Sequence, residues 1–312
     1  MGACVVLFFL SLSGVLALWC LNSPTKTSTR DEHIHIPAGA SLREIATILK
    51  DHSLIRSPLL FRLIIAYNHK ENVLHEGDYI FSVHTSTLQV ARGFMNQTAL
   101  VPLIKVTIPE GSTLADFDRI LSAALPNIKP GDIIKEAHGE EGVLFPDTYS
   151  LAESKSAADI VQLLKQTFDT KLTPLSSAMA SSSFSRKEII TLASLIEREA
   201  RGEESMGIVS GILQKRLTIH MPLQVDATFE YLFHKKSSEL GTSDLESDTP
   251  FNTYTHRGLP PSPIASPGLM AIEAVLAPTD TPYLYYLTDK EGVFHYAETF
   301  DEHKKNKARY LR

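Results

Sequence analysis

The 312-residue sequence predicts an α+β protein that follows an apolar N-terminal segment. Stretches of alternating apolar and polar residues, typical of strands, are interspersed with stretches whose apolar residues recur at helical spacing. Hydrophobic residues make up 43% of the chain, which is enough for a folded core and excludes global disorder. We expect a membrane anchor (1–21), a linker (22–30), a small module (31–105) and a larger domain (106–312).

The N-terminal segment has the features of a transmembrane signal anchor. Residues 3–21 carry no charge and, as a helix, would nearly match the roughly 30 Å hydrocarbon thickness of a bilayer. Two alternatives stay open: a signal peptide cleaved after Ala17, and a lipid-modified Cys20. Lys26 and Arg30 follow the segment and no basic residue precedes it. The positive-inside tendency alone would therefore leave the rest of the chain in the cytoplasm.

Charge and cysteine content exclude several classes of function. The net charge of −6 gives no electrostatic reason to expect nucleic acid as a partner. Both cysteines, Cys4 and Cys20, lie in the apolar segment, so the rest of the chain has neither a disulfide nor a thiolate metal site. We interpret one basic cluster as the solvated face of a terminal helix: Lys304, Lys305, Lys307, Arg309 and Arg312.

The small module shows the order strand, helix, helix, strand. A strand pattern at 33–37 leads into a helix whose apolar residues recur on one face, and Ser41 and Glu44 form a capping box at its start. A second apolar helix at 57–68 and a strand at 76–83 complete the pattern.

Part of this pattern occurs twice in the sequence. Residues 36–49 and 108–121 share Ile-Pro-x-Gly-x-Ser/Thr-Leu, followed by Ile or Leu at matching later positions. In both copies a Pro-Gly turn leads into a helix that a hydroxyl side chain caps. Two copies are too few for a solenoid. They indicate two related small units, or one strand–turn–helix corner used twice.

The larger domain changes character after residue 150. We expect a Ser-rich loop at 175–185 and a helix that Ser185 and Glu188 open with a capping box. The Pro-rich segment 248–278 is typical of a rigid loop that walls a cleft. Two further helices and a hairpin are predicted at 155–172, 203–217 and 282–299.

The stretch TLASLIEREA (191–200) carries the main candidates for chemistry. Glu197 and Glu199 flank the apolar side of this helix at opposite margins. A glutamate held against apolar surface can act as a general acid near neutral pH, whereas a solvated one is an ordinary boundary residue. Helix geometry does not decide between these interpretations or between the two glutamates.

Other candidate motifs are weaker. The sequence has no P-loop, HExxH or Gly-x-Ser-x-Gly motif. His33 and His35 fit a surface strand pair better than a metal site, so we expect neither a metal nor a cofactor. Asp226 has apolar neighbours before a predicted helix, where it is either a capping carboxylate or part of a site.

The chain from residue 141 onward resembles the endolytic murein transglycosylases of the YceG-like, or MltG, family. Five segments occur in the family's order: EGVLFPDTY (141–149), LASLIEREA (192–200), KRLTIHMPLQVDAT (215–228), FNTYTHRGLPPSPIASPG (251–268) and APTDTPYLYYLTDKEGVFHYAETFDEH (277–303). Residues 31–121 match more loosely and are similar to the LysM-like portion that precedes the catalytic domain in this family.

This resemblance implies an activity and a location. It implies cleavage of the β-1,4 bond between N-acetylmuramic acid and N-acetylglucosamine inside peptidoglycan strands, which leaves 1,6-anhydro ends and terminates the elongation of nascent strands. It also implies a single-pass anchor in the inner membrane, with the body facing the periplasm. The implied partners are glycan strands and the membrane, with peptidoglycan synthases as candidates.

The resemblance also implies roles for individual residues. Glu197 matches the family's catalytic acid, and we expect supporting roles for Glu199 and Glu141. The candidates for binding or orienting the sugar are Gln224, Asp226, Thr228, Asn252, Thr253 and Tyr254. The chain departs from the family's pattern at Val225, Ala227 and Lys215, which puts a subsite contact in doubt.

One glutamate suffices for the implied chemistry. It protonates the departing oxygen and then takes the proton of the C6 hydroxyl group, which closes the 1,6-anhydro ring without an activated water. Lysozyme, a standard example, uses a glutamate in an apolar pocket for the first step. Two alternatives stay open: a muramidase in which a second carboxylate such as Asp226 activates water, and a non-catalytic peptidoglycan-binding scaffold.

Overall fold

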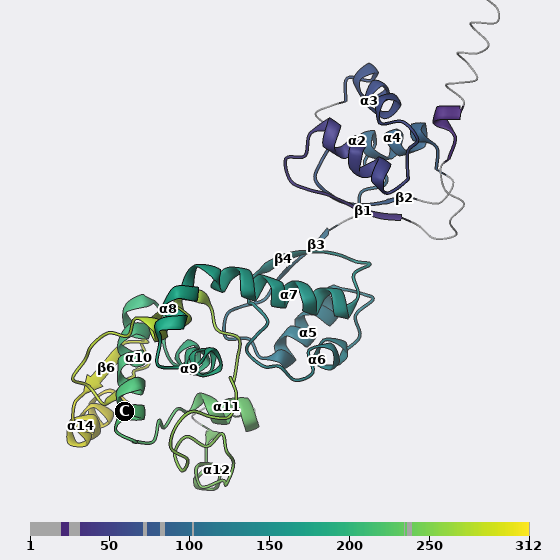
Figure 1. Ribbon diagram of the computed structural model, residues 1–312. Helices are drawn as coiled ribbons and strands as arrows, with labels where there is room; N and C mark the ends of the chain where they lie inside the picture. The colour runs from purple at the N-terminus through teal and green to yellow at the C-terminus, as the bar shows by residue number, and fades with distance from the viewer. Residues whose placement is uncertain are drawn as a thin grey trace, which may run out of the picture. The chain divides into compact units, whose positions relative to one another are not determined.

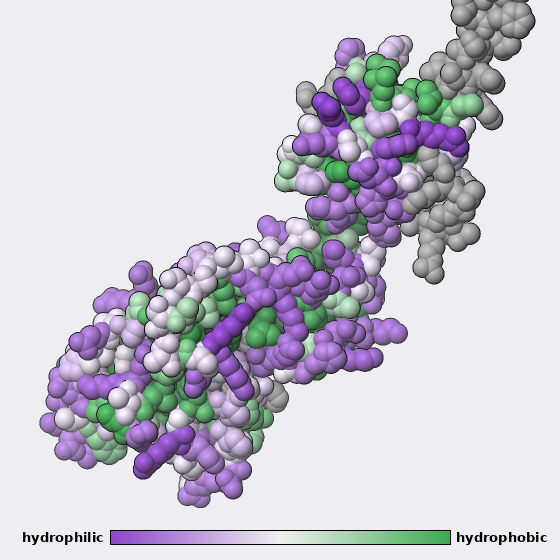
Figure 2. All heavy atoms as spheres, in the orientation of Figure 1, coloured by the Kyte–Doolittle hydropathy of each residue, from purple (hydrophilic) through white to green (hydrophobic). Residues whose placement is uncertain are grey.

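The computed structural model describes residues 20–24, 32–70, 74–81, 85–101, 103–233, 235 and 239–311. The chain divides into two compact units, Met1–Leu103 and Ile104–Arg312. The division lies two residues before the boundary that the sequence predicts. Within the described residues, helices combine with three two-stranded sheets, so the α+β class is confirmed (Figure 1). In the view of Figure 2, hydrophilic side chains dominate the visible face of each unit.

Unit 1 has the predicted order of elements and one additional helix. The strands β1 (Glu32–Ile36) and β2 (Gly77–Phe81) pair antiparallel, with Ile34 opposite Tyr79. Between them lie α2 (Leu42–Asp51) and α3 (Pro58–Tyr67), and α4 (Thr87–Met95) follows β2. All three helices and both strands contribute to one apolar core, in which the rings of Phe61, Tyr79 and Phe94 are in contact.

The membrane anchor lies almost entirely outside the described residues. Residues 1–19, which hold nearly all of the predicted span, are not among them. Within the part of the chain that the structure does describe, no helix has the length and apolar character needed to cross a bilayer.

The first half of unit 2 is built around a two-stranded sheet. The strand β3 (Leu103–Thr107) pairs with β4 (Thr148–Ala152). Three helices share one apolar core with this sheet: α5 (Leu114–Ala124), α6 (Asp132–Glu136) and α7 (Ala157–Leu172).

The second half of unit 2 surrounds one buried helix, α9 (Arg186–Glu199). Every residue from Ile189 to Ile196 is buried, and α9 packs against α10 (Glu203–Thr218) and α13 (Leu269–Leu276). The remaining elements are a 3-10 turn, three short or terminal helices and a hairpin: η2 (Thr173–Leu175), α11 (Ala227–Phe233), α12 (Thr242–Leu245), α14 (Phe300–Tyr310), β5 (Tyr285–Thr288) and β6 (Phe294–Ala297).

The prediction of a Ser-rich loop at 175–185 is wrong in part. Residues Ser176–Ser181 form α8, which continues from the 3-10 turn that follows α7. Serine favours turns because its hydroxyl group competes with the backbone for hydrogen bonds. Here Ser181 donates instead to the carbonyl group of Ser177, one turn earlier in the same helix. This bond leaves the helical hydrogen bonds intact.

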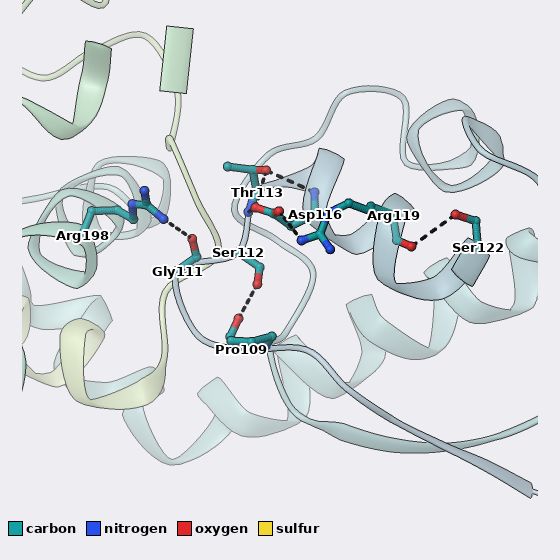
Figure 3. Close-up of polar contacts among 8 residues, drawn as sticks. All are labelled: Pro109, Gly111, Ser112, Thr113, Asp116, Arg119, Ser122 and Arg198. Atoms are coloured by element: carbon teal, nitrogen blue, oxygen red, sulfur yellow. Dashed lines mark hydrogen bonds and ion pairs between the residues drawn. The ribbon is translucent and has the colours of Figure 1, made fainter. Parts of the chain in front are cut away.

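The repeated corner is present in both units. Gly39 and Gly111 have φ values of 73° and 74°, a backbone region that favours glycine. Ser41 and Thr113 then cap α2 and α5, each in a capping box. In unit 2 the corner is held by further bonds: Ser112 donates to the carbonyl oxygen of Pro109 at 2.6 Å, and Arg198 donates to that of Gly111 at 3.2 Å (Figure 3).

Candidate functional site

Three consecutive side chains at the end of α9 point in different directions, because successive helical residues are rotated by about 100°. The carboxylate of Glu197 accepts a hydrogen bond from the N–H of Gly268 at 2.9 Å. Arg198 pairs with Glu230 at 2.6 Å, besides its bond to Gly111. Glu199 accepts a hydrogen bond from the hydroxyl group of Tyr286 at 2.9 Å.

Glu199 lies in a pocket of about 440 Å³ together with three of the residues predicted to bind sugar, Gln224, Asp226 and Tyr254. Asp226 and Gln224 come from the segment before α11, and Tyr254 comes from the Pro-rich loop. The hydroxyl group of Tyr254 donates to Asp226 at 2.5 Å. The sequence pattern therefore identified residues that converge on one pocket, and the glutamate among them is Glu199.

The environment of Glu199 suits a group that exchanges a proton near neutral pH. Burial raises its pKa from 4.5 to about 7, and the nearby Asp226 carboxylate adds to this rise. The hydrogen bonds from Tyr286 and from the backbone N–H of Ala227 act in the opposite direction, because they stabilise the charged form. The pKa is thus a balance in which burial is the largest contribution.

Glu197 lies in a different environment. Its pKa is also raised, mainly by burial and further by Glu110, while the Gly268 hydrogen bond lowers it. A Cβ atom at Gly268 would lie 1.9 Å from the Glu110 carboxylate, so the loop before α13 passes close to both acids. Within the described residues, Glu197 is not part of the pocket that holds Gln224, Asp226 and Tyr254.

Glu141 lines a separate pocket of about 490 Å³ with Tyr231 and Arg198. Its carboxylate accepts the N–H of Leu114 at 2.9 Å, at the start of α5. Burial raises its pKa to about 7, although the backbone of Leu114 and Gly142 and the side chain of Tyr231 lower it. Glu141 therefore holds the start of α5, and its supporting role stays a prediction.

Three of the six predicted sugar-binding residues are buried. Thr228, Asn252 and Thr253 are at most 2% exposed. Their polar atoms bond the backbone: Thr228 to the carbonyl group of Val225, Asn252 to those of Leu245 and Ser247, and Thr253 to the N–H of Val225. We therefore expect Thr228, Asn252 and Thr253 to position the site, and not to touch a glycan directly. Their bonds instead hold the segment of Gln224 and Asp226 beside Tyr254.

The side chains at the three departures from the family's pattern do not line the pocket of Glu199. The side chains of Val225 and Ala227 are buried in the core that surrounds α9. Lys215 donates to the carbonyl groups of Thr281 and Pro282, which joins α10 to the segment before β5. None of the three side chains lines the pocket, although the backbone N–H of Ala227 bonds the Glu199 carboxylate.

Sequence analysis missed several residues of this pocket, and Tyr286 and Arg216 are two of them. Tyr286 lies in the predicted hairpin and Arg216 in a predicted helix, where each fits the pattern of an ordinary structural residue. Arg216 is buried and donates to the carbonyl oxygen of Leu223 at 2.6 Å. Its guanidinium group also lies over the ring of Tyr285. Only the tertiary fold places these side chains beside Glu199, although the segments containing them carry the family resemblance.

We predict opposite pKa shifts of Glu199 in two single variants. Tyr286→Phe removes a donor to the carboxylate, so the pKa of Glu199 should rise. Asp226→Asn removes a neighbouring negative charge, so the pKa should fall. A carboxyl ¹³C NMR titration of the full chain would measure both shifts. Glu141, in the other pocket, is the internal control and should titrate unchanged. Shifts of the same sign in both variants would contradict the proposed balance.

Comparisons with known proteins find similar chains among the endolytic murein transglycosylases and the YceG-like proteins. A curated relative from Bacillus subtilis (strain 168), named endolytic murein transglycosylase, is 29% identical over 92% of this chain and 86% of its own length. A protein of the same name from Streptococcus pneumoniae D39 is 28% identical, and the match spans only 58% of its length. A crystal structure of a YceG-like protein from Listeria monocytogenes matches with a TM-score of 0.60 and 28% identity, covering 89% of this chain and 99% of that one.

The sequence pattern that defines the YceG-like family matches residues 34–309, which is most of the chain and includes both units. The expected family membership is therefore confirmed: this chain belongs to the YceG-like family.

Proposed function

We propose that this protein is an endolytic murein transglycosylase. It cleaves the bond between N-acetylmuramic acid and N-acetylglucosamine within peptidoglycan strands and leaves 1,6-anhydro ends. Cleavage inside a growing strand would end its elongation, which makes peptidoglycan synthases candidate partners. The observation that carries this proposal is Glu199, whose pKa is raised to about 7, in a pocket with Asp226, Gln224 and Tyr254. The names of the Bacillus and Streptococcus relatives support it.

We assign the proton transfers to Glu199 in place of Glu197, the residue that the sequence resemblance favoured. A general acid must reach the glycosidic oxygen of a bound sugar, so it should share a cavity with the groups that bind the sugar. Glu199 does so. The Glu197 carboxylate instead bonds the backbone at the start of α13, which suits a residue that holds the adjoining loop in place.

The mechanism needs only one carboxyl group. Protonated Glu199 donates to the departing O4 of N-acetylglucosamine as the glycosidic bond breaks. The resulting carboxylate accepts the proton of the C6 hydroxyl group of the muramic residue, whose oxygen bonds to C1. The ring that forms is the 1,6-anhydro product, and the enzyme returns to its protonated state.

A muramidase is the alternative that a specific observation favours. Asp226 lines the same pocket as Glu199 and could activate a water molecule, as the second carboxylate of a glycosidase does. The products separate the two activities, because a muramidase leaves reducing ends and a transglycosylase leaves anhydro ends. A scaffold without catalysis would leave the strands uncut.

Glu199→Gln should lower the rate of 1,6-anhydro product formation at least about 10²-fold, because an amide cannot donate and then accept a proton. Glu197→Gln is the matched control on the same helix. Its amide oxygen can still accept the Gly268 N–H, so most of the activity should remain. Mass spectrometry of glycan fragments measures both, with thermal melting to confirm folding. A folded Glu199→Gln protein that cleaves at the normal rate would refute the assignment, and loss of activity only in Glu197→Gln would restore Glu197.

Unit 1 is proposed to be a LysM-like module that binds glycan. Its strand–helix–helix–strand order supports this, as does a hollow of about 670 Å³ lined by the first turn and the start of α2. Deletion of residues 32–101 should weaken co-sedimentation with insoluble peptidoglycan more than it slows cleavage of short soluble strands. Equal co-sedimentation of the two proteins would show that unit 1 is only a spacer.

The N-terminal segment is proposed to be a single-pass anchor in the inner membrane, with the catalytic unit in the periplasm. The uncharged run of residues 3–21 supports the anchor, and a peptidoglycan substrate supports the orientation. After cell fractionation and a carbonate wash, the full-length chain should stay with the membranes. Its release in intact form would argue against an anchor, and release of a shortened chain would indicate a cleaved signal peptide.

A further inference from the structure

The pocket of Glu199 is lined by groups of both charge types. Glu199 and Asp226 supply carboxyl groups. The helices α10 and α14 supply nitrogen groups, from Arg216, His303 and Lys307. Lys307 belongs to the basic cluster that the sequence analysis interpreted as a solvated helix face. We name Arg216, His303 and Lys307 the basic wall.

The basic wall forms no salt bridge among the described residues, although Glu199 lies near enough to Arg216 to raise its pKa. Neither Arg216 nor Lys307 forms an ion pair with a carboxylate among the described residues. The guanidinium group of Arg216 donates to backbone oxygens, at 2.7 Å to Leu284 and 2.6 Å to Leu223. These bonds fix its position and leave its charge uncompensated by a salt bridge. Arg216 is buried, and buried cations are usually paired with an anion, so a buried cation at a pocket without a salt bridge indicates an anionic ligand.

His303 gives a second, independent observation. Its Nδ1 atom is buried and lacks a hydrogen-bond partner, the one side-chain atom of this kind among the described residues. The ring stacks on Tyr285, at 5.3 Å between centroids, which holds it at the pocket. Burial, Lys307 and Arg216 lower the pKa of His303. A buried nitrogen without a partner is costly unless a ligand completes its hydrogen bond.

We propose that the basic wall binds a carboxylate of the muramyl substrate and so sets which muramic residues the enzyme cleaves. This inference rests on the proposed function and adds a substrate preference to it. Two sources offer the same chemistry: the lactyl carboxylate of a muramic residue without a peptide, and a carboxylate of the peptide stem. Charge-assisted hydrogen bonds from Lys307 and His303 would hold either one.

This contact would also orient the sugar in the pocket. The carboxylate would lie beside Lys307 and His303 on α14, and the glycosidic oxygen would lie beside Glu199. The reverse orientation would bring the ligand's carboxylate against two carboxyl groups of the protein, which electrostatic repulsion disfavours. The polarity of the pocket therefore favours one direction of the strand past the acid.

The test compares three substrates with the full-length protein in detergent. The first is glycan stripped of its peptides by an amidase, so that lactyl carboxylates are free. The second is the same glycan with these carboxylates converted to methylamides, and the third still carries peptides. The wild-type protein should cleave at least one carboxylate-bearing strand with a kcat/KM about tenfold above that of the methylamide strand. Whichever strand is favoured identifies the source of the carboxylate.

Lys307→Gln should bring the ratio of kcat/KM between the favoured strand and the methylamide strand close to one, mainly through KM. Lys305→Gln, on the same helix but outside the pocket, is the matched control and should keep the wild-type ratio. Equal cleavage of all three substrates by the wild-type protein would overturn the proposal.

Binding separates this inference from the proposed function. Calorimetry on the Glu199→Gln protein, which does not turn over, should show the same preference for the carboxylate-bearing ligand, and Glu199→Gln/Lys307→Gln should lose it. A preference in binding without cleavage by the wild-type protein would support the basic wall and reject the transglycosylase. Cleavage without any preference in binding or rate would reject the basic wall alone.

Discussion

The burial of α9 is the constraint on which the rest of unit 2 depends. Its residues Ile189 to Ile196 are buried on all sides, and each buried aliphatic side chain contributes about 1.5–3 kcal/mol. The helix cannot rotate or shift without exposing this surface. The directions of the next three side chains are therefore fixed: Glu197 faces the start of α13, Arg198 the corner before α5, and Glu199 the pocket beneath the hairpin.

The same burial sets the proton affinity of Glu199. A rise in pKa from 4.5 to about 7 corresponds to about 3 kcal/mol between the protonation states, at 1.36 kcal/mol per pH unit. Because the folded pKa lies above the unfolded one, this carboxyl group reduces stability as pH rises from about 4.5 to 7 and costs the full amount above that range. An apolar residue would avoid this cost. The presence of a glutamate at this costly position, at the end of a well-packed helix, is what we expect of a group retained for proton transfer.

Local patterns were sufficient to predict the elements that carry the site. The capping boxes at Ser41 and Ser185, the repeated corner and the C-terminal hairpin depend on residues close together in sequence, where propensity and hydrogen bonding decide the outcome. The family resemblance then brought Gln224, Asp226 and Tyr254 into one site, and the structure places them in one pocket. The choice between Glu197 and Glu199 could not be predicted in this way. Both flank the apolar side of one helix, and only the loops packed against each margin distinguish them.

The buried amide and hydroxyl groups show a related limit of sequence analysis. Asn252 and Thr253 stand beside Tyr254 in the sequence, yet their side chains hold backbone segments while Tyr254 faces the pocket. A motif records that a set of residues is needed together, but it does not separate residues that touch a ligand from those that position them. Burial makes this distinction, because a polar atom already bonded inside the core cannot also bond a sugar.

Lys307 illustrates the opposite case. The sequence places it among five basic residues that resemble an ordinary solvated helix face, and helix α14 has no buried residue. In the structure Lys307 lines the pocket of Glu199. Its helix α14 packs against both strands of the hairpin β5–β6, and Tyr286, on β5, bonds Glu199. The helix that carries His303 and Lys307 thus packs on the strand that bonds the acid. A displacement of the hairpin would alter the acid's hydrogen bond and the distance to the cations together, so the recognition of charge and the transfer of the proton would be coupled through its position.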